Sequence, residues 1–143
     1  MKFNKLIPEL DVKDINKSLN FYVNVLNFKK EYERKGFAFV SYQGSQLMLD
    51  ELKSDSDWQT GKLEYPYGRG INFQIEVTNI DHIYNLLKKN KFSIKKNKFS
   101  IKRKFMENWY ECNGELLGNK EFLVMDPDGY LIRFCEELGV KIC

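Results

Sequence analysis

Polar side chains alternate with apolar ones along several short stretches of this sequence, and they are the first candidates for chemistry. In one stretch, Asn72, Gln74 and Glu76 alternate with apolar residues, and Glu9 and Arg133 occur in two similar stretches. Two carboxylates on one surface can act as acid and base. An arginine between them more simply forms an ion pair with them. The pattern therefore favours a binding surface over a catalytic one.

The sequence contains few other groups of residues that could support catalysis. Cys112, Cys135 and Cys143 are odd in number and show no CxxC spacing, which predicts free thiols rather than disulfides or a zinc site. The one histidine, His82, falls near the start of a predicted helix. That position favours a surface or capping role over metal binding or pairing with a thiol. From these residues we predict no catalytic group.

Two sequence segments, each predicted to form a β-hairpin, define the elements that must position the polar residues. The stretch 122–135 turns at Asp126-Pro127-Asp128-Gly129, and a fainter copy at 37–49 turns at Gly44. Proline fixes φ and glycine accepts positive φ, so both phrases can reverse direction tightly. A short segment that predicts the start of a helix precedes each hairpin, at 12–15 and at 77–80. The sequence therefore predicts a duplicated strand–helix–hairpin unit.

The expected elements follow from hydrophobic periodicity. They are a strand at 6–12, a helix at 14–26 between an Asp14 N-cap and Asn27, strands at 29–33, 37–42 and 46–51, a connection at 53–70, a strand at 71–77, a helix at 80–89, a less certain strand within 91–105, and strands at 120–125 and 130–136. Trp109 and Tyr110 are placed in a loop or short strand. We predict an α+β fold with two βαβββ modules that form a curved mixed sheet with a concave ligand cleft.

Length and composition limit the architecture and the partners. With 143 residues and 43% hydrophobic content, the chain can bury one ordinary core. We expect a single domain, 1–143, with module one at 1–52, the connection at 53–70 and module two at 71–138. No apolar run reaches the roughly 20 residues that cross a bilayer, and the N-terminus lacks a signal-peptide pattern. We therefore expect a cytoplasmic protein with no membrane partner.

Charge is unevenly distributed. The stretch 88–104 holds nine of the 23 basic residues and no acidic one, so the rest of the chain has a net charge of −6 although the whole has +3. Within that stretch, the phrase at 88–94 is repeated without change at 95–101. A polyanion or membrane contact is one interpretation. We favour a solvated, partly disordered segment or an edge strand protected by lysines, and we do not expect a nucleic-acid partner.

Three phrases, at 11–28, 71–77 and 126–134, occur in the order typical of a known superfamily. Together they resemble the vicinal oxygen chelate superfamily, which includes glyoxalases, bleomycin-resistance proteins and dioxygenases. The resemblance implies paired βαβββ modules, commonly in a dimer with two clefts. It places the metal-ligand positions of the enzymes at Ile7, Met48, Asn72 and Arg133. Isoleucine cannot bind a metal, methionine is a poor ligand for a hard ion and arginine is cationic, so the resemblance implies no metal and no cofactor.

A missing metal site is typical of the bleomycin-resistance group, whose members sequester a bulky cationic glycopeptide between aromatic and acidic side chains at a dimer interface. The resemblance thus implies a homodimeric binder of a small molecule, such as a bleomycin-like antibiotic. The expected ligand-binding residues are Glu9, Phe39, Met48, Trp58, Asn72, Gln74, Trp109, Tyr110 and Arg133. Arg133 fits an anionic ligand group better than a cationic one. The alternative is a glyoxalase-like lyase or isomerase that works without metal or through Glu9, Gln74 and Glu76.

Overall fold

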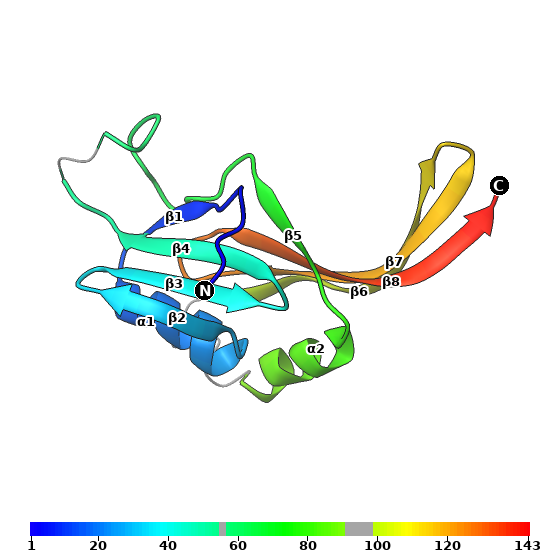
Figure 1. The fold of residues 1–143 in the computed structure, drawn as a ribbon, viewed down its shortest axis with the longest axis horizontal. Helices are drawn as coiled ribbons and strands as arrows, with labels where there is room; N and C mark the ends of the chain where they lie inside the picture. The colour runs from blue at the N-terminus through cyan, green and yellow to red at the C-terminus, as the bar shows by residue number, and fades with distance from the viewer. Residues whose placement is uncertain (55–56, 91–98) are drawn as a thin grey trace.

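A computed structural model describes residues 1–54, 57–90 and 99–143 of the chain (Figure 1). The first module contains β1 (Glu9–Val12), α1 (Ile15–Leu19), the π-helix η1 (Asn20–Val25), β2 (Lys29–Arg34), β3 (Phe37–Tyr42) and β4 (Ser45–Glu51). The second contains β5 (Asn72–Glu76), α2 (Ile80–Lys89), β6 (Ser100–Cys112), β7 (Glu115–Met125) and β8 (Leu131–Ile142). The predicted α+β class and the two βαβββ modules are confirmed.

Each module forms its own mixed sheet of four strands. The strand orders are β1-β4-β3-β2 and β5-β8-β7-β6. In both sheets the first and last strands of the module pair in parallel, and the remaining pairs are antiparallel. The parallel pairing requires a crossover, which the helix of each module provides. The helices lie on one side of the sheets (Figure 1).

The two predicted hairpin turns form as their glycines indicated. Gly44 and Gly129 both adopt a φ of +87°, a region that residues with a side chain rarely occupy. The amide of Gly129 donates to the Asp126 carbonyl at 3.0 Å, and the Asp126 amide donates to Tyr130 at 2.9 Å. A glycine at each reversal therefore fixes the register of both hairpins.

The first helix begins as predicted but does not stay an α-helix. Asp14 caps it by accepting hydrogen bonds from the amides of Asn16 and Lys17. The helix is α as far as Leu19 and then widens into η1. Asn27 follows it with a φ of +65°, the left-handed conformation that commonly ends a helix. The predicted bounds are confirmed, and the change to π geometry was not expected.

Buried hydroxyl and carboxyl groups join the two modules. The Tyr22 hydroxyl donates to the Asp126 carboxylate at 2.7 Å, and the Ser18 hydroxyl donates to the Asp128 carboxylate at 3.3 Å. Both serine and tyrosine come from the first helix, whereas both aspartates belong to the turn between β7 and β8. The surrounding hydrophobic core contains buried residues from both modules. The helix of module one is thus anchored to the hairpin of module two.

The outer ends of β6, β7 and β8 extend well beyond the predicted strands. We call residues 107–119 and 137–142 the arm; it projects away from the body of the molecule (Figure 1). Of the two predicted alternatives for Trp109 and Tyr110, a loop or a short strand, the strand is confirmed, but β6 is long and extends from Ser100 to Cys112. Gly118 lies in β7 beneath the Trp109 ring, where a Cβ atom would meet the ring at 2.4 Å.

The lysine-rich repeat is only partly covered, since residues 91–98 lie outside the described residues. Its end, from Ser100, belongs to β6. All three cysteines are free thiols, as predicted, and Cys135 is buried on β8. Neither helix in the described ranges has the length and apolar character needed to span a membrane.

Candidate functional site

Strand register collects polar groups on the side of the second sheet that faces away from its core. Cys135 on β8 pairs with Glu121 on β7, which pairs with Met106 on β6. In the next row, Gln74 on β5 pairs with Arg133 on β8. Side chains of paired residues lie on the same face. Sheet pairing therefore brings together residues that are far apart in the sequence.

Glu121 is the centre of this group. Its side chain is only 4% exposed. The Asn108 amide nitrogen donates to its Oε1 at 2.6 Å, and the Tyr110 hydroxyl donates to the same oxygen. The second oxygen, Oε2, is buried and has no hydrogen-bond partner among the described residues. A buried acceptor without a partner costs free energy, so Glu121 is ready to accept a hydrogen bond from a ligand or another chain.

Arg133 lies beside this acid without forming the ion pair that the sequence indicated. Its Nη2 donates to the Gln74 Oε1 at 2.7 Å, and its buried Nε finds no acceptor within the described part of the chain. The ion pairs of the described residues do not include Arg133. The prediction of an ion pair between Arg133 and the carboxylates of Glu9 and Glu76 was wrong. Glu9 lies on the other sheet, and the Arg133 guanidinium donates its hydrogen bond to Gln74 instead.

The site shifts the acidity of two neighbouring groups. The hydrogen bond to Glu121 raises the pKa of Tyr110, with partial burial adding to the effect. Burial raises the pKa of the Cys135 thiol, and the nearby carboxylates of Glu76 and Glu121 raise it further. Both groups are therefore protonated at neutral pH. Tyr110 is a hydrogen-bond donor here, and Cys135 is not an activated nucleophile.

Two cavities adjoin these residues. One, of about 150 Å³, is lined by Glu121, Arg133, Tyr110, Asn72 and their neighbours. The other, of about 280 Å³, lies between the two modules, where Gln46 and the segment 4–8 approach Asn72 and Gln74. Asn72 lines both. The structure thus brings together four of the predicted site residues, namely Asn72, Gln74, Tyr110 and Arg133.

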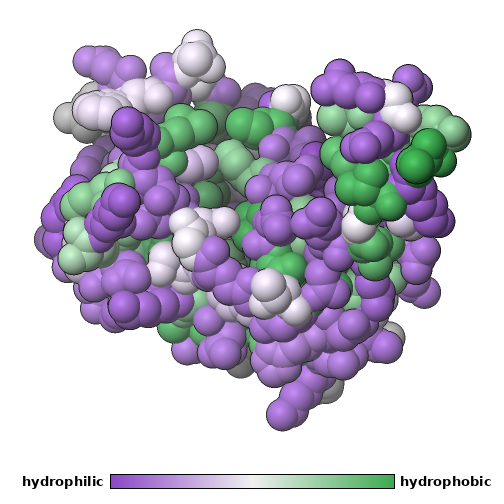
Figure 2. Space-filling view, turned by 45° about the vertical axis from the view of Figure 1, so that its right-hand side comes forward, coloured by the Kyte–Doolittle hydropathy of each residue, from purple (hydrophilic) through white to green (hydrophobic). Residues whose placement is uncertain are grey.

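The same face continues outward as an apolar row on the arm. Tyr110, Leu117 and Val140 are neighbours in register on β6, β7 and β8. They are exposed by 41%, 37% and 52%, respectively. Figure 2 shows apolar side chains gathered at the right of the view, where the arm comes forward. A polar pocket therefore lies beside an uncovered apolar surface.

Three other predicted residues lie together on the first sheet. Glu9, Met48 and Phe39 are consecutive partners on β1, β4 and β3. Burial raises the pKa of Glu9, and Asp50 and Asp11 raise it further. Phe39 has no exposed surface, because Phe3 packs on its ring at 5.3 Å and Tyr32 at 5.4 Å. The expectation that Phe39 offers an open ring to a ligand is therefore corrected.

The two tryptophans also lie away from the Glu121 group. Trp58 is 83% exposed in the connection between the modules. Trp109 faces the opposite side of the arm from Tyr110, where it packs over Gly118 and receives the Lys141 ammonium at 3.7 Å from its ring centroid. Adjacent strand residues point to opposite faces, so Trp109 and Tyr110 cannot line one surface of this sheet.

Sequence reasoning missed Glu121 and Asn108. The signal was present, because Glu121, Leu123 and Met125 alternate with buried Phe122 and Val124. The same alternation had located Gln74 and Arg133. Asn108 could not be found in this way, since β6 contains irregular register between Ile101 and Met106.

Sequence and fold comparisons agree with the two-module fold. The profile of the Glyoxalase/Bleomycin resistance protein/Dioxygenase superfamily matches residues 8–134. The chain belongs to this superfamily. Proteins named "Bleomycin resistance protein" from Geobacillus stearothermophilus and Staphylococcus aureus are 29% identical to it over 140 residues, which cover 92% of this chain and 96% of each relative.

Solved structures show the same superfamily fold. A glyoxalase/bleomycin resistance protein/dioxygenase from Alicyclobacillus acidocaldarius has a TM-score of 0.59 at 18% identity and covers 95% of this chain and 92% of its own. A hypothetical protein from S. aureus has a TM-score of 0.67 at 17% identity and covers 95% of both chains. At such identities the likeness establishes the fold alone.

The donor set does not fit the metal that enzymes of the superfamily hold. Of the four positions implied by the resemblance, Asn72 and Arg133 line the cavity near Glu121, and Met48 lies on β4. Isoleucine, methionine and arginine are unsuited to a hard divalent ion. Among the described residues, no three His, Cys, Asp or Glu side chains are grouped as metal ligands. We therefore derive no metal-dependent step.

Proposed function

We propose that this protein is a metal-independent binder that sequesters a bulky aromatic or glycopeptide antibiotic of the bleomycin type. Glu121 carries the proposal, because its Oε2 is buried, lines a cavity and has no hydrogen-bond partner in the described ranges. An amine or amide of such a ligand can donate to this oxygen. A charge-assisted hydrogen bond is roughly twice as strong as a neutral one. The names of the 29% identical relatives support the same ligand class.

The ligand site is proposed to lie at the interface of a homodimer. The cavity lined by Glu121, of about 150 Å³, and the cavity lined by Gln74, of about 280 Å³, are smaller than the roughly 300–1,000 Å³ typical of small-molecule sites. The apolar row of Tyr110, Leu117 and Val140 continues the same face and is uncovered. A second copy packed on this row would bury apolar area and deepen the site. Glu9, Met48 and Trp58, which lie elsewhere in one chain, would then contribute from the partner's surface.

Isothermal titration of metal-stripped protein with metal-free bleomycin tests the proposal. We expect saturable binding of about one ligand per subunit, unchanged by chelator. Glu121→Gln keeps the shape of the side chain and removes its charge, so affinity should fall at least about tenfold. Glu107→Gln makes the same charge change on the opposite face of the arm and should bind like the wild type.

Two results would contradict this function. One is the absence of bleomycin binding to the folded, metal-stripped protein. The other is a stoichiometric heat of binding for zinc, nickel or manganese that must precede any ligand binding. The second result would favour the glyoxalase-like lyase or isomerase and direct the search to substrates of that class.

A further inference from the structure

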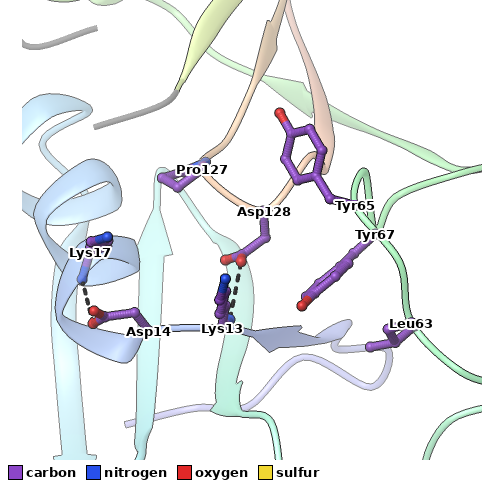
Figure 3. A pocket seen from close by; sticks show the side chains of 8 residues that line it. All are labelled: Lys13, Asp14, Lys17, Leu63, Tyr65, Tyr67, Pro127 and Asp128. Atoms are coloured by element: carbon purple, nitrogen blue, oxygen red, sulfur yellow. Dashed lines mark hydrogen bonds between the residues drawn. The ribbon is translucent and has the colours of Figure 1, made fainter. Parts of the chain in front are cut away.

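A third cavity, larger than the two near Glu121 and Gln74, lies at the other end of the β7–β8 hairpin. It has a volume of about 470 Å³ and shares no lining residue with the Glu121 cavity. Three segments line it: the start of the first helix, the connection before β5 and the turn after β7 (Figure 3). Its lining residues are Lys13, Asp14, Lys17, Leu63, Tyr65, Tyr67, Pro127 and Asp128. This volume lies within the roughly 300–1,000 Å³ range of small-molecule sites.

The acidic groups of this cavity accept hydrogen bonds from the protein itself. Asp14 accepts from the amides of Asn16 and Lys17 through one oxygen, Oδ1. The carboxylate of Asp128 is only 6% exposed and accepts from the Lys13 amide at 3.0 Å and from the Ser18 hydroxyl. Burial also raises the pKa of Asp128. Both oxygens of Asp128 therefore serve the protein's own donors, and Asp14 serves as the N-cap of the first helix.

The basic groups are available. The side chains of Lys13 and Lys17 are exposed, and neither ammonium group forms a hydrogen bond or ion pair with the residues that the structure describes. Two ammonium groups on one rim favour an anion by Coulomb attraction. The polar end of a ligand would lie on the side of the cavity formed by Lys13 and Lys17.

The opposite wall is aromatic and held in place. Figure 3 shows the rings of Tyr65 and Tyr67 across the cavity from Lys17. The Tyr67 amide donates to the Asp128 carbonyl at 2.9 Å, and the Arg69 guanidinium donates to the Tyr65 carbonyl at 2.8 Å. Pro66 packs so closely on the turn that a Cβ atom at Gly129 would lie 2.3 Å from the Pro66 Cβ. This wall is therefore organised before any ligand arrives.

We propose that this cavity binds a small aromatic anion, with a flat ring against Tyr65 and Tyr67 and a phosphate or carboxylate at Lys13 and Lys17. Tyrosine faces favour stacking or edge contacts with flat rings, and lysine is a common partner of phosphate. Neither tyrosine hydroxyl has a hydrogen-bond partner in the described part of the chain. A mononucleotide and an aromatic acid share this chemistry.

The test uses both classes of anion as probes for the intact protein. Adenosine 5′-monophosphate and 2-naphthoate are titrated separately while amide ¹H–¹⁵N shifts are recorded. We expect saturable shifts of residues 13–17 and 63–67 with at least one probe. Adenosine lacks the anion, inorganic phosphate lacks the ring and naphthalene-2-methanol lacks the carboxylate, so each should bind at least about tenfold more weakly than the matching probe.

Substitutions test which side chains contact the probes. The double substitution Lys13→Gln/Lys17→Gln should weaken binding at least about tenfold, and Tyr65→Ser should also weaken it. The matched double variant Lys5→Gln/Lys62→Gln changes exposed lysines that do not line the cavity and should bind normally. Unchanged thermal melting of each variant shows that folding is intact. The proposal is overturned if neither probe saturates, if the shifts map to the Glu121 cavity, or if the Lys13/Lys17 variant binds as tightly as the wild type.

Discussion

Asp126 should make the stability of this protein fall as the pH rises from about 4 to about 7. Burial raises the pKa of its carboxyl group from 3.8 to about 7, although hydrogen bonds from Tyr22 and two backbone amides oppose the shift. Between these values the folded chain keeps a proton that the unfolded chain has lost. Its contribution to stability is fully present below the unfolded pKa and is lost as the pH passes the folded pKa.

The size of the effect follows from the two pKa values. They differ by about three units, and each unit corresponds to about 1.4 kcal/mol. The Asp126 side chain has no exposed surface, so solvent screening does not reduce this contribution. The free energy of unfolding should therefore decrease by up to about 4 kcal/mol across this range because of Asp126 alone.

The variant Asp126→Asn separates the effect of the Asp126 carboxyl group on stability from the effects of other titrating groups. Its remaining oxygen can still accept from the amides of Asp128 and Tyr130, as Oδ1 does at 3.0 and 2.8 Å, but the side chain no longer titrates. Urea unfolding curves at pH 4 to 8 should show a decline for the wild type that is much shallower in the variant. Burial also raises the pKa values of Glu9 and Asp128, so some decline remains in both. Parallel profiles for the two proteins would refute the assignment.

Three further substitutions test the turn, the module contact and the arm. Gly129→Ala should destabilise the fold by about 2 kcal/mol or more, measured by urea unfolding. Gly44→Ala should cost about 1 kcal/mol, because it has the same φ but no atom within 4 Å of its added Cβ; equal losses would refute the clash with Pro66. Tyr22→Phe leaves the Asp126 carboxylate without its hydroxyl donor and should cost about 1–3 kcal/mol; a thermal melt that matches the wild type would contradict this. Val140→Lys should weaken the proposed dimer at least about tenfold in sedimentation velocity, whereas Glu111→Gln, with the same charge change on the opposite face of the arm, should not.

The sequence predicted what depends on local signals. Alternation and turn glycines located both hairpins, and the helix at Ile80–Lys89 has the predicted bounds. Duplication of these signals then predicted two modules. Alternation along β5 and β8 also placed Gln74 and Arg133 on one face, which the register confirms. These features need only the period of a strand and the conformational range of glycine.

The remaining features depend on contacts between distant segments. The arm was missed because two glycines in its sequence, Gly114 and Gly118, are typical of loops. In the structure Gly118 lies in a strand, where its lack of a side chain leaves room for the Trp109 ring. Phe39 has the right periodicity for the open face, yet the segment containing Phe3 folds back over its ring. No pattern within a single strand reveals which other segment will cover it.

The buried acids of this chain explain why its candidate antibiotic site is Glu121 and not the more acidic turn. Both oxygens of Asp126 and both of Asp128 accept hydrogen bonds from the protein's own amides and hydroxyls. Their role is to hold module one against the β7–β8 hairpin, and a ligand could reach them only by breaking these bonds. Glu121 uses one oxygen for Asn108 and Tyr110 and leaves the other without a partner. Folding alone does not recover the cost of burying that oxygen, whereas a donor supplied by a ligand or a second subunit does.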